Sequence, residues 1–234
     1  MLTERELKEN LEDVERRITA AAEKSGRSRG DITLVAVTKT HGTELMNAAI
    51  RLGVTDIGEN RPQAIRDKFG GVLPVKWHMI GQLQTNKIKY IIDKVCLIHS
   101  VDSVHLMEEI DKQAKKHGIT ANILIEVNIS GEATKSGVAP SELEELLVRA
   151  GGFDSVKVKG LMTVAPKIDG DITNTLHFDN MHKLFIDIGN KKYDNVSMEY
   201  LSMGMSGDFE TAIECGSNMV RVGTAIFGAR EYPV

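Results

Sequence analysis

The chain has 234 residues, of which 41% are hydrophobic and 26% are charged, and its formal net charge at pH 7 is -4. This length fits one α/β barrel or two small domains, and the composition is ordinary for a globular protein. The small negative charge excludes a strong general attraction to nucleic acid or to an anionic membrane. We expect a single domain over residues 1–234, with neither of these partners.

The N-terminal stretch is charged throughout and has no apolar signal-peptide core, while no segment approaches the length that spans a bilayer. We therefore expect a cytoplasmic protein. The two cysteines, Cys96 and Cys215, show neither CxxC nor Cys/His ligand spacing, so we expect no metal site. The glycine-rich loops typical of nucleotide binding are also absent from the sequence.

The first stretch, from residue 2 to about residue 25, is predicted to be an amphipathic helix. Its apolar residues recur at three- and four-residue intervals with charges between them. Thr3 and Glu6 fit a capping box, because the hydroxyl and the carboxylate can each satisfy a free backbone donor. We expect this helix to lie outside the units that follow it.

From residue 31 onward, short apolar runs alternate with helical patterns that often begin at Ser or Thr and end at Gly. Eight runs are predicted strands: 32–38, 54–58, 75–81, 95–101, 122–129, 156–164, 196–204 and 219–223. Eight strand–helix units predict a TIM (β/α)8 barrel with an extra N-terminal helix. A doubly wound open sheet is the alternative.

In either parallel architecture, a binding site forms where the strands end at their carboxyl termini. Polar residues and glycines close most of the predicted strands, and we expect them to meet on one rim. They are Lys39, Glu59, Asn60, Gly81, Gln82, Ser100, Asn128, Thr163, Ser206, Arg221 and Gly223.

Lys39 follows the apolar run 32–38 and allows two interpretations. Its stem could pack on the barrel while its amine reaches solvent or pairs with Glu59. Burial beneath the rim would instead favour the neutral amine, which is a nucleophile able to form a Schiff base with an aldehyde.

The C-terminal part of the sequence offers donors for an anion. Ser206 precedes a short helical pattern, and Gly223 and Thr224 follow the last strand, where backbone N–H groups and hydroxyls can approach a ligand closely. These residues could also serve only as turns and a helix cap. TIM barrels often hold phosphate after strands seven and eight, so both segments together favour a phosphate site.

Three further polar residues are candidates with competing explanations. Arg221 lies in an apolar strand, where it could pair with a carboxylate such as Glu199 or Glu214, or donate to a ligand. His78 is interpreted as a core histidine without assigned chemistry. Lys135, in a Gly/Ser-rich loop after the fifth strand, is interpreted as a solvated charge on the ligand side.

A nucleophilic lysine after strand one, together with a phosphate site after strands seven and eight, suggests pyridoxal 5′-phosphate as the ligand. The sequence resembles the pyridoxal phosphate homeostasis protein family (YggS/PROSC), which is similar to the N-terminal barrel of alanine racemase. The resemblance rests on "LVAVTKTHG", "IGENRPQ", "WHMIGQLQTNK", "EVNISGEATKSG", "GLMTVAP" and "LSMGMSGDFETAIECGSNMVRVGTAIFGAR", in that order.

The resemblance implies a role for each matching residue. Lys39 would form the internal aldimine, Asn60 would lie near the cofactor ring and Arg221 would face the pyridine nitrogen. The phosphate would be held by Ser206, Gly223 and Thr224. The segment "KTHG" departs from many relatives, which carry a proline near its third position, and we expect no effect of this change on Lys39.

The resemblance also bears on catalysis. Alanine racemases add a C-terminal β domain and a second acid/base from a partner subunit, whereas this sequence stops 13 residues after Arg221. A cation beside the ring nitrogen also weakens the cofactor as an electron sink. We expect a monomeric cofactor carrier without robust catalytic activity, with pyridoxal-phosphate-dependent apoenzymes as its partners. A low-activity racemase or lyase is the alternative, followed by a Schiff-base aldolase.

Overall fold

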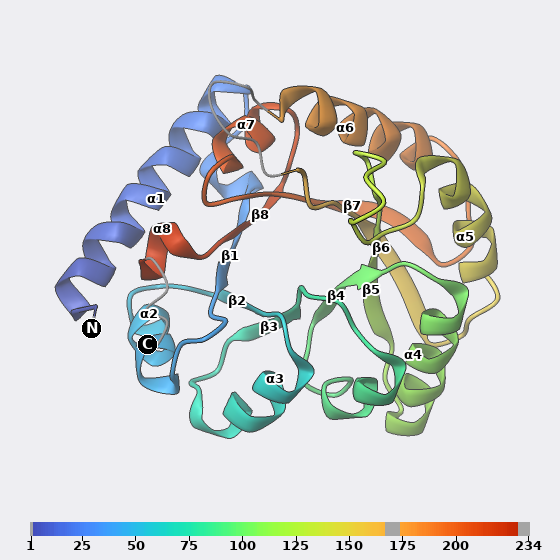
Figure 1. Cartoon of the computed structure of the whole chain (residues 1–234), viewed down its shortest axis with the longest axis horizontal. Coiled ribbons are helices and arrows are strands. Elements are labelled where there is room, and N and C mark those ends of the chain that lie inside the picture. The colour runs from blue at the N-terminus through green and yellow to red at the C-terminus, as the bar shows by residue number, and fades with distance from the viewer. Residues whose placement is uncertain (1, 167–173, 229–234) are drawn as a thin grey trace.

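The computed structural model describes residues 2–166 and 174–228. Its strands are all parallel and close into a barrel in the order β1 to β8 (Figure 1). The strands are β1 (Thr33–Val37), β2 (Asp56–Glu59), β3 (Lys76–Met79), β4 (Leu97–Val101), β5 (Ala121–Glu126), β6 (Val156–Met162), β7 (Val196–Met205) and β8 (Met219–Val222). Each overlaps one predicted run. The predicted TIM barrel is confirmed, and the open sheet is excluded because β8 pairs with β1.

Helices surround this barrel on its outside (Figure 1). They are α1 (Glu4–Lys24), α2 (Thr43–Arg51), α3 (Pro62–Lys68), α4 (Val104–His117), α5 (Leu143–Ala150), α6 (Thr175–Gly189), α7 (Phe209–Glu214) and α8 (Thr224–Phe227). In the described residues an α-helix follows every strand except β3, which is followed by the 3₁₀ helix η3 (Thr85–Tyr90).

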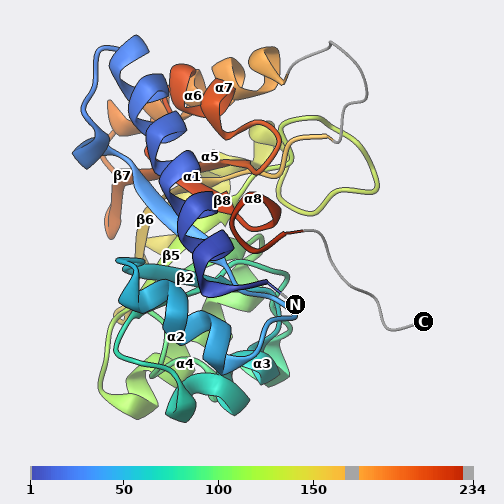
Figure 2. The same ribbon diagram turned by 90° about the vertical axis from the view of Figure 1, so that its left-hand side faces the viewer.

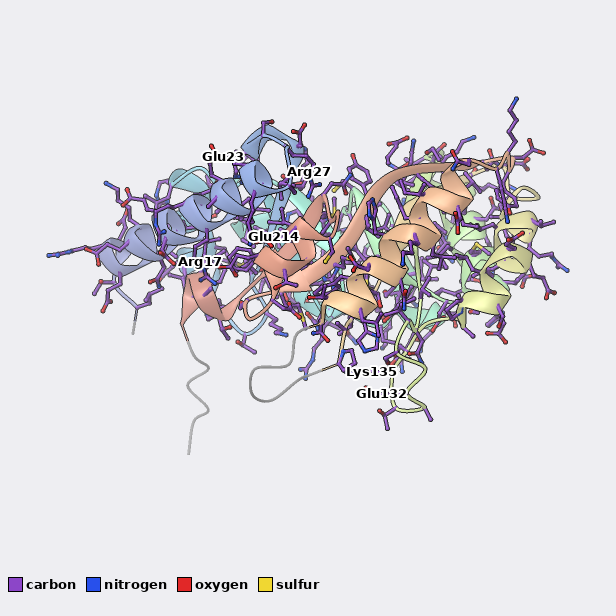
Figure 3. All side chains as sticks on the ribbon, turned by 90° about the horizontal axis from the view of Figure 1, so that it is seen from above. Arg17, Glu23, Arg27, Glu132, Lys135 and Glu214 are labelled. Atoms are coloured by element: carbon purple, nitrogen blue, oxygen red, sulfur yellow. The ribbon has the colours of Figure 1, made fainter. Side chains whose placement is uncertain are left out.

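The predicted N-terminal helix is confirmed as α1, together with its capping box. The backbone N–H of Glu6 donates to the Thr3 hydroxyl at 3.2 Å, and the Thr3 N–H donates to the Glu6 carboxylate at 2.8 Å. The apolar stripe of α1 is buried against α7 and α8, and Arg17 pairs with Glu210 at 2.7 Å (Figures 2 and 3). The helix therefore supports the two elements that follow β7 and β8.

Two apolar regions stabilise the barrel. A large one lies between the strands and the outer helices, as the alternation of buried residues requires. A small one fills part of the interior and consists of Val35, Leu97, Leu124, Met162 and Met219. No helix among residues 2–166 and 174–228 combines the length and the apolar character needed to cross a bilayer.

The pairing of β6 with β7 depends on a glycine. Gly160 has φ +145°, and the register between these strands shifts next to it. A Cβ atom at this position would lie 1.9 Å from the carbonyl oxygen of Tyr200. Only glycine allows the two backbones to approach so closely.

Candidate functional site

Barrel closure brings the predicted site residues to one rim. Lys39 and Asn60 follow β1 and β2, while Ser206 and Gly223 follow β7 and β8, with Thr224 next in the chain. Because β7, β8, β1 and β2 are consecutive in the barrel, these residues occupy adjoining strand ends. We call this part of the barrel the carboxyl rim.

Lys39 is half-buried beside a fixed ion pair. The carboxylate of Glu59, itself buried, accepts from the ammonium of Lys68 at 2.7 Å and from the hydroxyl of Thr38 at 2.9 Å. These bonds hold the end of β1, directly before Lys39, against β2 and α3. His41 packs its ring on Phe227 of α8 with 4.9 Å between centroids, so the loop that carries Lys39 also contacts the helix that follows β8.

Asn60 presents a polar atom without a partner. Its side-chain oxygen is buried, and it receives no hydrogen bond from any described residue. Such an atom costs free energy unless a ligand or water supplies a donor. A Cβ on Gly81 would lie 2.5 Å from the Asn60 carbonyl oxygen, so the close approach of the segment after β3 fixes this position. The Asn60 amide therefore fits a role in binding a ligand with a donor group.

Ser206 brings the segments after β7 and β8 together. Its hydroxyl oxygen accepts from the backbone N–H groups of Gly223 at 3.0 Å and of Ala225 at 3.3 Å. Two incoming hydrogen bonds leave the hydroxyl proton to be donated outward, toward an anion. Gly223 lies close to β1, because a Cβ there would come within 3.3 Å of the Val37 Cβ. The outward hydroxyl proton of Ser206 thus fits a phosphate donor, whereas the Gly223 N–H donates to Ser206 in this structure. Thr224, next in the chain, begins α8 beside them.

Arg221 is buried and hydrogen-bonded within the barrel interior. Its guanidinium donates to the hydroxyl of Ser202 at 2.5 Å and to the carbonyl oxygen of Thr163 at 2.9 Å. Burial lowers its pKa to about 10, while the charges of Glu126 and Asp208 oppose that shift. The guanidinium is therefore a cation at neutral pH.

The ion pairs that the sequence suggested for Arg221 are wrong. Glu199 pairs with Lys159 at 2.7 Å, and Glu214 pairs with Lys24 at 2.8 Å. Glu199 is exposed near the start of β7, and Glu214 ends α7, which faces α1 (Figure 3). Both carboxylates therefore lie away from the interior that holds Arg221.

Glu126, at the end of β5, was not predicted as a site residue. Its side chain is 7% exposed, and burial raises its pKa to about 7, with a further rise from Asp102 and a decrease from Arg221. A carboxyl group that titrates near neutrality within reach of a buried cation is typical of functional sites. The acidic residue that ends the apolar run "NILIE" was its signal in the sequence.

The raised pKa of Glu126 predicts that part of the free energy of unfolding depends on pH. The folded pKa of about 7 exceeds the ordinary value of 4.5, so folding favours the protonated form. The stabilisation is complete below pH 4.5 and is lost as the pH rises through 7. At 1.36 kcal/mol per pKa unit, Glu126 contributes about 3 kcal/mol to this loss.

Glu126→Gln should remove this component, because glutamine stays neutral. Urea unfolding at pH 5 and pH 8 measures it as a smaller decline in the free energy of unfolding than in the unmodified protein. Glu199→Gln, which changes an exposed glutamate, should keep the full decline. If the free energy of unfolding of Glu126→Gln declines between pH 5 and pH 8 as much as that of the unmodified protein, Glu126 is not the source of this component.

His78 and Lys135 lie at very different depths. His78 is buried, as predicted, but it also contacts His99 and Asp56, which the sequence did not indicate. Lys135 is partly exposed on the loop between β5 and α5, which projects from the side of the barrel where α8 lies (Figures 2 and 3). Its expected position on the ligand side agrees with this placement.

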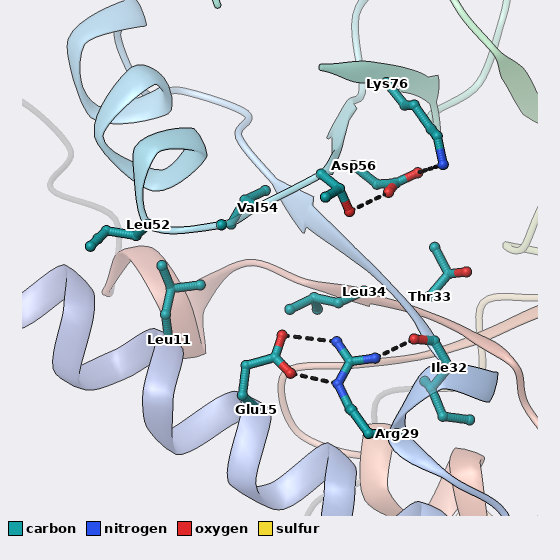
Figure 4. Close-up of a pocket in the computed structure, with 12 residues that line it drawn as sticks. Leu11, Glu15, Arg29, Ile32, Thr33, Leu34, Leu52, Val54, Asp56 and Lys76 are labelled. Carbon is teal, nitrogen blue, oxygen red and sulfur yellow. Dashed lines mark hydrogen bonds and ion pairs between the residues drawn. The ribbon is translucent and has the colours of Figure 1, made fainter. Parts of the chain in front are cut away.

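Two cavities open at the other end of the barrel, where the strands begin. One, of about 420 Å³, lies between α1 and the starts of β1 and β2, and the Glu15–Arg29 ion pair lines it (Figure 4). The second, of about 440 Å³, is lined by residues of all eight strands, among them Asp56, Lys76 and His78. We call the second cavity the amino-terminal mouth. Neither cavity belongs to the carboxyl rim.

Comparison with known proteins decides the family. Residues 9–231 match the model of the alanine racemase N-terminal domain. A pyridoxal phosphate homeostasis protein from Aquifex aeolicus (strain VF5) is 42% identical over 226 residues, which cover 96% of this chain and 98% of the relative. The chain belongs to the pyridoxal phosphate homeostasis protein family. The resemblance found in the sequence is confirmed.

Solved structures of similar proteins share this fold. A protein of unknown function from Bifidobacterium adolescentis has a TM-score of 0.90 and 38% identity, covering 96% of this chain and 95% of that one. PipY from Synechococcus elongatus PCC7942, in a structure with pyridoxal phosphate bound, has a TM-score of 0.77 and 27% identity. That match covers 89% of this chain and 100% of PipY. PipY, which shares this barrel fold, therefore binds pyridoxal phosphate in its solved structure.

Proposed function

We propose that this chain binds pyridoxal 5′-phosphate and takes part in its intracellular homeostasis, holding it as a Schiff base on Lys39. The observation that carries the proposal is the meeting of three features on one rim. These are the amine of Lys39, the unpartnered amide oxygen of Asn60, and the Ser206 hydroxyl with its two backbone donors. PipY, in a structure with this cofactor bound, supports the choice of ligand.

Each residue has a proposed part in binding. The cofactor supplies an aldehyde, a phosphate and an electron-withdrawing ring. The Lys39 amine condenses with the aldehyde and releases water, and addition of water reverses the linkage. Ser206, Gly223 and Thr224 hold the phosphate. Arg221 faces the ring nitrogen, and Asn60 lies near the ring.

Holding the cofactor, rather than using it, fits the electrostatics of the site. Arg221 keeps its positive charge at neutral pH, and a cation disfavours protonation of a nearby ring nitrogen. The ring then withdraws electrons less strongly, so carbanion chemistry is slow. The Aquifex aeolicus relative is named for homeostasis rather than for a reaction. We propose that the reversible linkage serves storage and transfer, with pyridoxal-phosphate-dependent apoenzymes as recipients.

Borohydride reduction followed by peptide mapping tests the linkage. Borohydride reduces a C=N bond, so the cofactor becomes permanently attached to the residue that carried it. We expect the label on the peptide that contains Lys39. A label on Lys135 would move the covalent site to the loop after β5, and a protein without label would overturn the covalent assignment.

The second candidate function is a racemase or lyase of low turnover. The match to the alanine racemase N-terminal domain over residues 9–231 favours it. The loaded protein is incubated with a panel of L- and D-amino acids, and chiral chromatography follows their conversion. We expect no conversion above that produced by free pyridoxal phosphate. Faster racemisation by the protein would favour the enzymatic function.

A further inference from the structure

Five buried polar side chains form a continuous chain of hydrogen bonds through the barrel. Arg221 donates to the Ser202 hydroxyl at 2.5 Å, and that hydroxyl lies 3.1 Å from Nδ1 of His99. Nε2 of His99 lies 2.9 Å from Nδ1 of His78, and Nε2 of His78 lies 2.9 Å from Asp56. Each of the five is at most 4% exposed. We call Asp56, His78, His99 and Ser202 the interior chain.

The interior chain crosses the inside of the barrel from one wall to the other. Asp56, His78 and His99 come from the adjacent strands β2, β3 and β4. The next contact, from His99 to Ser202, joins β4 to β7, which are not neighbours in the barrel. The interior chain therefore connects the amino-terminal mouth, which Asp56 and His78 line, with Arg221 near the end of β8.

The chemistry of the two ends fixes the direction of the first and last bonds. Arginine can only donate, and an ionised carboxylate can only accept. Burial alone would raise the pKa of Asp56, but hydrogen bonds from His78 and Thr55 and the charge of Lys76 hold it below its usual range. Asp56 is therefore the accepting end at neutral pH, and Arg221 is the donating end.

One arrangement of protons satisfies all four contacts with both histidines neutral. In it, Ser202 accepts from Arg221 and donates to Nδ1 of His99, and both histidines carry their proton on Nε2. Burial lowers the pKa of His99 well below its ordinary value, with a further decrease from the charge of Arg221, which agrees with a neutral ring. The reverse arrangement would require a second proton on His78 and would leave the Ser202 hydrogen without an acceptor in the chain. Cys96, near His78, donates its thiol to the Trp77 carbonyl.

We propose that the interior chain positions Arg221: it fixes the direction of the guanidinium and links this buried cation to the carboxylate of Asp56. The role of Arg221 toward the ring nitrogen rests on the proposed function. Residues at the opposite end of the barrel then act on the cofactor without contacting it. A hydrogen-bonded path of aligned donors carries this effect, because each bond polarises the next.

Two variants and one matched control test the proposal. Ser202→Ala removes the link to Arg221, and Asp56→Asn removes the anion while keeping the shape of the side chain. Glu199→Gln changes another carboxylate of the amino-terminal mouth that lies outside the interior chain. Circular dichroism confirms that each variant is folded.

Nitrogen NMR of the imidazole rings shows which ring nitrogens in the interior chain carry a proton, and it needs no cofactor. We expect both His78 and His99 to carry the proton on Nε2 at neutral pH in the unmodified protein. In Ser202→Ala, the Nδ1 resonance of His99 should shift because its donor is lost. A proton on Nδ1 of either ring, or a doubly protonated His78, would overturn the proposed arrangement.

Titration with pyridoxal phosphate measures how each variant changes the affinity for the cofactor and its absorbance. Ser202→Ala should weaken binding roughly tenfold, as expected for one buried charged donor that loses its acceptor. Asp56→Asn should shift the absorbance maximum of the bound cofactor, and Glu199→Gln should change neither quantity. If both interior-chain variants bind pyridoxal phosphate with unchanged affinity and absorbance, the proposed positioning of Arg221 is refuted. The proposed function would still stand. If the unmodified protein binds no pyridoxal phosphate, the proposed function fails, and the NMR result still decides the proton arrangement.

Discussion

Replacing Lys39 with alanine is expected to abolish covalent retention of pyridoxal phosphate. An alanine side chain offers no amine to condense with the aldehyde, so borohydride should leave no label on the protein. The phosphate donors around Ser206 remain, so the variant should keep weak, dialysable binding. Absorbance after gel filtration measures the change, since the unmodified protein should keep the cofactor spectrum and the variant should lose it.

Lys135→Ala is the matched control for this experiment. It removes another lysine that lies on the same side of the barrel, on the projecting loop labelled in Figure 3. The control should retain the cofactor spectrum and the borohydride label. An unchanged spectrum in Lys39→Ala, or its loss in Lys135→Ala, would contradict the assignment of Lys39.

Gly160→Ala is expected to have the largest effect on stability. The new Cβ would lie 1.9 Å from the Tyr200 carbonyl oxygen, and alanine would be strained at φ +145°. The clash is with backbone, so relief requires β6 and β7 to separate at their register shift. We expect a loss of roughly 3–5 kcal/mol in the free energy of unfolding. Chemical denaturation monitored by circular dichroism measures it.

Gly118→Ala separates the cost of the clash from the cost of backbone strain. Gly118 ends α4 at φ +65°, and a Cβ there would meet nothing within 4 Å. This control should lose only about 1 kcal/mol, as expected for alanine in the left-handed conformation. Equal losses in the two variants would show that the approach of β6 to β7 is not the limiting constraint.

The strands were predictable because burial on both faces requires continuous apolar and β-branched runs. Their ends were less predictable, as the fifth strand shows. The run 122–129 predicted a longer strand than the observed β5, which ends at Glu126. Val127 instead forms a bridge with Val138 in the following loop. The same apolar residue is suitable for the barrel and for this loop, so composition alone could not separate them.

The rim positions were predictable because parallel barrels gather strand ends, whereas the contacts of the interior were not. The bond between His99 and Ser202 joins residues 103 positions apart on strands that do not pair. Hydrophobic periodicity indicates which residues face inward, but it does not show which of them share a layer of the barrel. For the same reason the sequence indicated neither the partners of Arg221 nor the raised pKa of Glu126.

The pairing of β8 with β1 has a consequence for how the protein acquires its ligand. Lys39 lies 167 residues before Ser206 in the sequence. The proposed amine and phosphate donors therefore become neighbours only when β8 pairs with β1. Under the proposed function, capture of pyridoxal phosphate thus requires a closed barrel, and the ligand should slow global unfolding rather than the opening of one loop.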